Sequence, residues 1–344
     1  MHILIVKRGA LGDVVRTSYF ASALKRRWGT DLRLSWLTAP AAVPLLKFNP
    51  HIDEIWTSFE QCASHQFNMV FSFDDELDAL KGVARLDSAC FTGALLDEAG
   101  KATYTEDANE WFDMGLLSRF GKTRADELKK KNRSGHVEIF SKILGVDDVK
   151  PEFFGDQTLE AWAAYRLSVP GLHIGINPFA GGRWPSKELR LGELRNVVRA
   201  LLEIDAGKHG VIHLTLFGAG EDLTRNHALV AEFADPRLRA AETDDSVLRF
   251  AALIGRLDYL VTSDSLALHL AVAQGVPFMA FFSPTSAAEI DGFGVGRKLI
   301  SHASDYCSYR KNADNSSITS TRVVAAFVEH AADLGLLEAH HAVI

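Results

Sequence analysis

The feature that most constrains the fold is a regular alternation of short apolar runs with segments of helical period. Residues 3–6 form a first apolar run, residues 14–28 carry apolar side chains at helical spacing, and residues 32–37 form the next run. Short buried strands separated by amphipathic helices are typical of parallel sheets with crossover helices. The further segments that continue this series are residues 41–47, 54–57, 69–73, 172–177, 191–203, 212–217, 221–233, 246–255, 259–262, 266–274, 277–282 and 321–334.

The series is interrupted once and then restarts. Between about residues 91 and 135 the pattern weakens, and residues 119–133 form a polar, basic run, so an irregular segment is expected there. A fresh strand pattern follows Pro170-Gly171, which favours a domain boundary near residues 155–171. The sequence predicts an α/β protein of two doubly wound, Rossmann-like domains that face a central cleft. We place these domains at residues 1–165 and 166–344, with the last helix as a candidate to pack back onto the first domain.

Composition excludes several classes of protein. With 47% hydrophobic and 24% charged residues the chain is that of a globular protein, and its net charge of −7, spread over both halves, argues against nucleic acid as a partner. Three cysteines without C-x-x-C spacing favour neither structural zinc nor disulfides, and they fit a reducing cytoplasm. No apolar run is long enough to span a bilayer, and Lys7-Arg8 interrupts the first one. We therefore expect a cytoplasmic protein, with at most peripheral contact at the inner face of the membrane.

In open α/β sheets ligands lie beyond the carboxyl ends of strands, so the loops there carry the functional candidates. The first loop, KRGALGD, contains Gly9 and Gly12 but matches neither the G-x-G-x-x-G nor the G-x-x-x-x-G-K-[ST] phosphate template. Its last residue, Asp13, falls at the start of a helix. Two compatible interpretations remain open: a helix cap, and a carboxylate held ionised at the mouth of the cleft.

The second loop, residues 177–187, has the sequence NPFAGGRWPSK. Its two glycines, Gly181 and Gly182, stand beside the cations Arg183 and Lys187 at the end of a strand, an arrangement that suits an anionic ligand. A solvated connector with ordinary surface charges is the alternative.

The third loop, Phe217 to Asp222, reads F-G-A-G-E-D. Gly218-x-Gly220 lacks the third glycine of a dinucleotide motif and is weak evidence for NAD. A carboxylate here, Glu221 or Asp222, either accepts hydrogen bonds from ribose hydroxyls or caps the following helix.

The fourth loop is the most informative of the set. A strand ends at Thr262, and Asp264-Ser265 precedes a helix that contains His269 one turn in. Backbone amides at a helix N-terminus form an anion site, and Ser265 adds a hydroxyl. His269 either points at the same anion or packs in the core.

In this order, the four loops resemble those of the heptosyltransferases, glycosyltransferases that use ADP-heptose and have the GT-B fold. The resemblance rests on the opening I-x-I-x-K/R-x-G-A-L-G-D and on three later segments: N-P-x-A-G…W-P-S-K, G-x-G-E-D and S-D-S-L-A-L-H-L-A-x-A-x-G-V-P…F-x-P-T. It spans the chain from Met1 to about Val328. One departure is Leu266-Ala267, where many members have Gly-Pro, and this puts the preferred base and heptose in doubt.

The resemblance implies roles for individual residues. Asp13 matches the family's proposed catalytic base, and Lys187 matches a lysine near the donor phosphates. Glu221 or Asp222 matches an acid that bonds the ribose, and the alignment does not choose between them. The predicted donor-binding residues are Asn177, Gly181, Gly182, Lys187, Gly218, Glu221, Asp222, Asp264, Ser265, Leu266 and His269, and the acceptor-side residues are Arg8, Gly12 and Arg16.

The resemblance also implies a reaction. The expected activity is inverting transfer of a heptose from ADP-heptose, the donor substrate, to a hydroxyl of a lipopolysaccharide core or a related glycan, glycolipid or small-molecule acceptor. No D-x-D pair stands at a suitable place, so we expect no metal ion, and no cofactor is implied. Asp74-Asp75, with Glu76 and Asp78, is interpreted as a charge cluster at a helix start.

Several points stay open at this stage. Alternatives are transfer from another nucleotide sugar, a sugar-nucleotide epimerase on a similar scaffold, and a nucleotide-sugar-binding sensor without turnover. The basic residues 119–133 form either a solvated loop or a contact for a phosphorylated acceptor. The sequence does not determine the acceptor or the oligomeric state.

Overall fold

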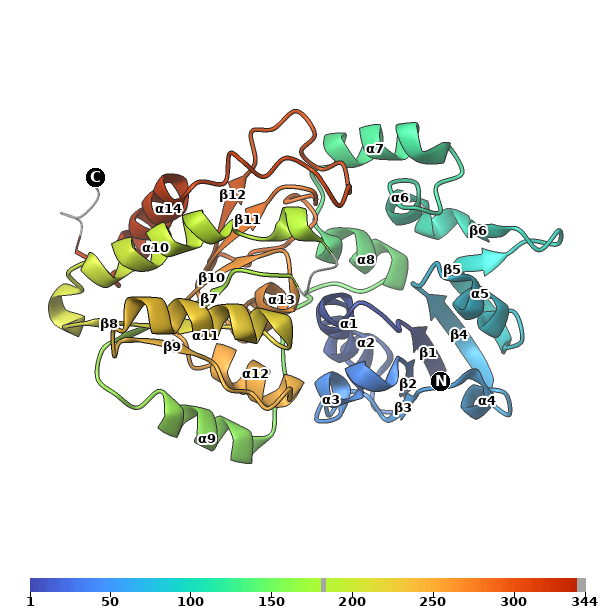
Figure 1. Ribbon diagram of the computed structural model, residues 1–344. Helices are drawn as coiled ribbons and strands as arrows, with labels where there is room; N and C mark the ends of the chain where they lie inside the picture. The colour runs from blue at the N-terminus through green and yellow to red at the C-terminus, as the bar shows by residue number, and fades with distance from the viewer. Residues whose placement is uncertain (181–183, 339–344) are drawn as a thin grey trace. The chain divides into compact units, whose positions relative to one another are not determined.

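The computed structural model describes residues 1–180 and 184–338, and the chain divides into two compact units (Figure 1). Unit 1 contains Met1–Phe154 and the short segment Ala288–Asp291, and unit 2 contains Gly155–Ala287 and Gly292–Ile344. Residues 155–165, which the sequence placed in the first domain, thus belong to unit 2, where α9 (Gln157–Arg166) packs against α12 (Val247–Ile254). The segment 288–291 joins unit 1 through Asp291, which accepts a hydrogen bond from the amide of Val137.

The sheet of unit 1 has six strands in the order β3-β2-β1-β4-β5-β6. All neighbouring pairs are parallel except β5 and β6, which form an antiparallel edge. Its strands are β1 (His2–Val6), β2 (Arg33–Leu37), β3 (Glu54–Trp56), β4 (Gln66–Ser72), β5 (Asp87–Leu96) and β6 (Ala102–Tyr104). Residues 3–6 of β1 are fully buried, as expected of a central strand covered on both faces.

The helices of unit 1 differ from the sequence prediction at several positions, and two of the differences concern long segments. The single helix expected over residues 14–28 is two helices, α1 (Leu11–Ser18) and α2 (Phe20–Trp28), which meet at Tyr19. The segment expected to be irregular contains α7 (Gly121–Lys131), in which only Ala125 is buried, so no apolar period marks it in the sequence. The remaining helical segments are η1 (Pro40–Ala42), α3 (Val43–Leu46), α4 (Phe59–Cys62), α5 (Leu77–Val83), η2 (Glu106–Ala108), α6 (Asn109–Phe112) and α8 (His136–Leu144).

The sheet of unit 2 is parallel throughout, in the order β12-β11-β10-β7-β8-β9. Its strands are β7 (Leu172–Asn177), β8 (Ile212–Leu216), β9 (Leu238–Ala240), β10 (Tyr259–Ser263), β11 (Phe278–Phe282) and β12 (Gly296–Ile300). Besides α9 and α12, its helical segments are η3 (Pro185–Lys187), α10 (Leu191–Glu203), η4 (Gly207–His209), α11 (Glu221–Phe233), α13 (Leu266–Ala273) and α14 (Ser320–Asp333).

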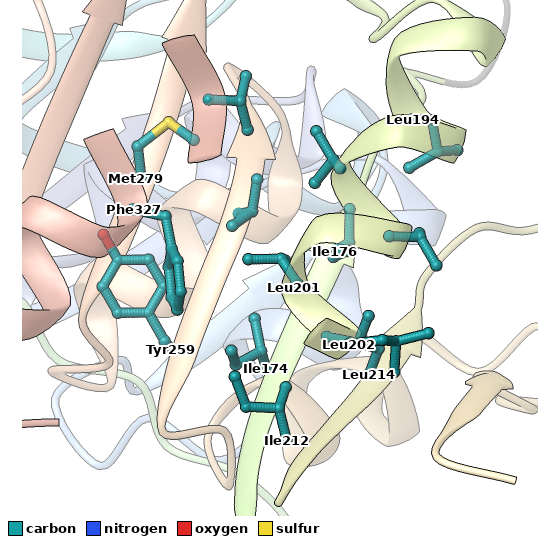
Figure 2. Packing of buried hydrophobic residues seen from close by; sticks show 14 of the residues in the cluster. Ile174, Ile176, Leu194, Leu201, Leu202, Ile212, Leu214, Tyr259, Met279 and Phe327 are labelled. Carbon is teal, nitrogen blue, oxygen red and sulfur yellow. The ribbon is translucent and has the colours of Figure 1, made fainter. Parts of the chain in front are cut away.

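One apolar cluster holds the sheet of unit 2 against α10 and α14 (Figure 2). Ile174 and Ile176 of β7 contribute to it together with Leu201 of α10. Phe327 of α14 meets Tyr259 of β10 edge to face, with ring centroids 4.9 Å apart. The last helix, α14, therefore packs against β11, β12 and α10 within unit 2.

Both sheets have the doubly wound strand order, which confirms the predicted fold class. The direction of winding reverses between β1 and β4 in unit 1 and between β7 and β10 in unit 2. In such sheets the carboxyl ends of the two strands at the reversal point flank the ligand-binding position. The fold thus points to two places: the residues just after Val6 and Ser72, and the residues around Asn177 and Thr262. No helix within residues 1–180 and 184–338 is long and apolar enough to cross a membrane.

Candidate active site

At the reversal point of unit 2, polar side chains from the ends of β7 and β10 bond to one another. Asn177 is paired in register with Thr262 across the two strands. The Asn177 amide nitrogen donates to Ser265 Oγ at 3.2 Å and to the carbonyl oxygen of Phe179 at 3.1 Å. Thr262 Oγ1 lies 3.1 Å from Ser265 Oγ. The strand order therefore places two hydroxyls and an amide at one point on the sheet edge.

Lys187 reaches the same point from the loop after β7. Its ammonium donates to the backbone oxygen of Asp264 at 3.0 Å and to Asp264 Oδ2 at 2.9 Å. His269 Nε2 lies 3.8 Å from Asp264 Oδ1. The side chains of Lys187 and Asp264 are 17% and 16% exposed, so a partly buried cation stands beside the start of α13. Lys187, Asp264, Ser265 and His269, all predicted from the sequence, are thus brought together.

The start of α13 differs in detail from the sequence interpretation. Ser265 occupies the N-cap position, but its side chain makes no capping hydrogen bond to the helix; it bonds Asn177 and Thr262. The helix amides of the first turn are therefore not satisfied by this side chain, which leaves an electropositive helix start next to the Lys187 ammonium. Leu266, the first residue of α13, is half-buried, and His269 is buried.

In the F-G-A-G-E-D turn, Glu221 and Asp222, which the sequence did not distinguish as ribose-binding candidates, have different surroundings. Asp222 is buried and pairs with Arg225 Nη1 at 3.2 Å, whereas Glu221 is exposed at the first position of α11. Gly218 packs against α11, because a Cβ atom there would lie 2.8 Å from the Cβ of Asp222. Gly220 has φ +55°, a conformation that favours glycine, so it forms the tight entry to the helix.

Arg225 is a residue of this region that the sequence analysis missed. Its guanidinium carbon lies 3.5 Å from the centre of the Phe179 ring, and its Nη1 atom lies 3.0 Å from Glu188 Oε2. These contacts tie α11 to the loop after β7. Of that loop, Gly181, Gly182 and Arg183 lie outside the described residues.

At the reversal point of unit 1, Asp13 is flanked by two cations. Arg16 Nη2 lies 2.8 Å from Asp13 Oδ1, and Lys7 Nζ lies 3.9 Å from Asp13 Oδ2. The N-cap of α1 is Ala10 and Asp13 is the third residue of the helix, so Asp13 is not the N-cap residue, although as an acid in the first turn it complements the helix dipole. Its side chain is 34% exposed, and Gly12 beside it is buried.

Lys7 and Asp74 form a second feature that the sequence analysis missed. Asp74 follows the end of β4, is only 2% exposed, and accepts a hydrogen bond from Lys7 Nζ at 2.8 Å. It also accepts one from the Arg8 amide. Asp74 was interpreted as part of a charge cluster at a helix start, but it is buried and bonds the loop after β1 instead of the start of α5. Asp78 of that cluster pairs with Arg8 on the surface. The signal that could have identified Asp74 is its position just beyond a strand that neighbours β1.

In α7, Lys122 pairs with Asp126 and Arg124 with Glu127, so part of the basic run is neutralised within its own helix. Among residues 1–180 and 184–338, no cluster of three or more His, Cys, Asp or Glu side chains could hold a metal ion.

Comparison with known proteins shows that the fold is similar to that of several solved structures. No protein-family model matches the sequence, and no curated protein sequence matches it either. Among solved structures, a glycosyl transferase family 9 protein from Veillonella parvula superposes with a TM-score of 0.74 at 18% identity, covering 96% of this chain and 97% of that one.

Two Escherichia coli enzymes are also similar along nearly their whole length. The ADP-heptose lps heptosyltransferase II has a TM-score of 0.66 at 14% identity, covering 97% of this chain and 100% of its own. Heptosyltransferase WaaC, solved with ADP, has a TM-score of 0.63 at 16% identity, covering 96% and 100%. The chain therefore has the two-unit α/β fold of the heptosyltransferase-like GT-B glycosyltransferases, as the sequence resemblance predicted.

Proposed function

We propose that the protein is an inverting glycosyltransferase that transfers a heptose from ADP-heptose to an acceptor hydroxyl. The observation that carries this proposal is the cluster at the end of β7 and β10, where a partly buried ammonium, two hydroxyls and a helix N-terminus meet. Such a set of donors suits a diphosphate. The likeness of fold to heptosyltransferases, one of them solved with ADP, supports ADP-heptose as the donor.

In this proposal unit 2 binds the donor. Lys187, the first-turn amides of α13 and Ser265 contact the diphosphate, and the exposed Glu221 accepts hydrogen bonds from the ribose hydroxyls. We prefer Glu221 over Asp222 because Asp222 is buried and already paired with Arg225. As the bond from the anomeric carbon to the β-phosphate oxygen breaks, its electron pair leaves with ADP. Preorganised donors stabilise that growing negative charge.

Unit 1 supplies the proton acceptor. The acceptor oxygen attacks the anomeric carbon on the face opposite to ADP, so the configuration inverts, and its proton passes to the Asp13 carboxylate. General-base assistance of this kind is worth about 10²–10⁴-fold in rate. Arg8 and Arg16, near Asp13, are proposed to face the acceptor, which we expect to be a lipopolysaccharide core or a related glycan. The reaction as written needs no metal ion.

The test is an incubation of the purified protein with ADP-heptose, with and without a panel of phosphorylated and unphosphorylated glycan acceptors. We expect ADP and a heptosylated product to appear together, and only when an acceptor is present. Isomerised sugar nucleotide in the absence of acceptor would show an epimerase. Tight binding of ADP-heptose with no turnover on any acceptor would favour a sensor, and both outcomes would overturn the proposal.

A further inference from the structure

Asp74 in unit 1 is a carboxylate that is almost completely buried. Burial of a charge is unfavourable unless it is paired and hydrogen-bonded. Asp74 meets this requirement with Lys7 Nζ on Oδ1 and the Arg8 amide on Oδ2. Both donors belong to the loop that follows β1, so Asp74 fixes the course of the chain just before Asp13.

Lys7 lies between two carboxylates. Its ammonium is 2.8 Å from Asp74 and 3.9 Å from Asp13, and its side chain is 12% exposed. Burial disfavours the charged form of Lys7, but Asp74 and Asp13 outweigh that effect and raise the pKa of Lys7. The ammonium therefore stays charged, and Asp74 holds it closer than Asp13 does.

Asp13 has a further cation on its other oxygen. Arg16 contacts Asp13 Oδ1, and its guanidinium carbon lies 5.3 Å from the centre of the Trp111 ring. A carboxylate flanked by two full positive charges is a weak proton acceptor, because each charge favours its ionised form. Neutralising one of the cations restores its basicity.

We propose that Asp74 and Lys7 form a positioning pair that sets the basicity of Asp13. Asp74 neutralises most of the effect of the Lys7 ammonium on Asp13, and the Arg16 guanidinium, at 2.8 Å, is then the stronger of the two cations. The inference rests on the proposed function insofar as Asp13 is the base of a transferase, but the electrostatic coupling of the three side chains is a property of unit 1 itself.

Loss of the two members of the pair has opposite consequences. In Asp74→Asn the Lys7 charge is no longer neutralised, and Asp13 then keeps its negative charge to lower pH. In Lys7→Met the part of the Lys7 charge that Asp74 does not cancel is gone, so Asp13 takes up a proton at higher pH. Burial favours the neutral form of Asp74 in that variant, so this upward shift is the smaller of the two. A pair that served only to hold the fold would give no such opposed shifts.

The other charged groups that act on Lys7 and Asp74 are Arg16 of α1 and Glu76 after β4, and none of these variants replaces them. His136 of α8 contacts the Trp111 ring on which Arg16 stacks, and Asp291 acts on Tyr19; both also stay in place. Comparison of the variants with the parent protein therefore isolates the contribution of Lys7 and Asp74.

The experiment measures turnover against pH and, separately, the titration of the Asp13 carboxylate by ¹³C NMR, assigned with Asp13→Asn. We expect the acidic limb of the turnover profile and the NMR titration to move down by about one pH unit in Asp74→Asn and to move up by a smaller amount in Lys7→Met. Lys7→Arg keeps the cation and should restore the parent profile. The matched control is Asp87→Asn, which removes an exposed carboxylate at the start of β5, the opposite end of the sheet.

The outcomes separate the pair from the proposed function. NMR titrations that stay in place in both variants, or move in the same direction, overturn the positioning pair even in an active transferase. If the Asp13 titration moves in opposite directions in the two variants but the protein transfers no sugar, the positioning role of Asp74 and Lys7 is supported and only the proposed function fails. The melting temperature of each variant is measured as a check on folding. If Asp74→Asn does not fold, the test rests on whether the Asp13 titration moves to higher pH in Lys7→Met and returns to the parent value in Lys7→Arg.

Discussion

Replacement of Lys187 by Ala tests the proposed diphosphate site most simply. The Lys187 ammonium has three N–H donors, and within the described part of the chain two of them are used by Asp264. The third donor is therefore the one that we expect to bind a phosphate oxygen. The variant removes this donor and also takes the Lys187 ammonium away from the Asp264 carboxylate, which lies beside the place proposed for an anion.

The magnitude follows from these contacts. A hydrogen bond to a charged group contributes about 1.5–3 kcal/mol. Because Asp264 is only 16% exposed, loss of the Lys187 ammonium beside it adds repulsion toward ADP, and we expect the upper part of that range. A loss of about 2–3 kcal/mol corresponds to ADP binding that is about 30- to 150-fold weaker.

Isothermal titration calorimetry with ADP measures this change directly, and two salt concentrations show whether a charge is involved. The matched control is Lys208→Ala, which removes a cation from an exposed position on η4 in the same unit. Unchanged ADP affinity in Lys187→Ala would remove Lys187 from the site. Equal weakening in Lys208→Ala would show that net charge, and not this contact, governs binding.

Three further predictions follow from particular side chains. Glu221→Gln should weaken ADP binding by about 1–2 kcal/mol in calorimetry, whereas Asp222→Asn should mainly lower the melting temperature, and the reverse pattern would contradict the assignment of the ribose contact. Burial opposes the ionised form of Asp53, but hydrogen bonds from Lys25 and the Leu34 amide outweigh it and lower the pKa of Asp53. Its contribution to stability is then present above its ordinary pKa and lost as the pH falls through the lowered value. Urea unfolding should therefore show Asp53→Asn less stable than the parent at pH 7, with a gap that closes as the pH falls below the ordinary pKa of an aspartate; a gap that persists in acid contradicts this account. Transfer should continue after treatment with EDTA, and a loss of turnover that added metal restores would refute the metal-independent mechanism.

The sequence predicted the fold class well because buried parallel strands are rich in apolar residues, and such segments can be recognised in the sequence. Residues 3–6 are a continuous apolar run, and residues 172–177 carry apolar side chains at alternate positions (Leu172, Ile174 and Ile176); both segments proved to be central parallel strands. Helices without an apolar period were missed for the complementary reason. In α7 nearly all side chains face water, so nothing in the sequence of residues 121–131 distinguishes a helix from a basic loop.

The candidate site was predictable where a motif coincided with a strand end. Lys187, Asp264 and Ser265 were identified because glycine-rich or capping patterns precede helices there, and the structure brings them together. Asp74 was missed because its partner Lys7 is 67 residues away, and only the pairing of β1 with β4 brings the two together. The choice between Glu221 and Asp222 likewise depends on burial, which a turn motif does not reveal.

The measurement that tests the account most directly is turnover of Asp13→Asn, with its melting temperature and ADP affinity determined in parallel. Because Asp13 is 34% exposed and does not cap α1, loss of its charge should change stability by no more than about 1 kcal/mol. The account predicts a fall in turnover of at least about 10²-fold with ADP affinity unchanged, since Asn cannot take the acceptor proton. Near-parental turnover in a stable Asp13→Asn protein would contradict the central claim that Asp13 is the general base.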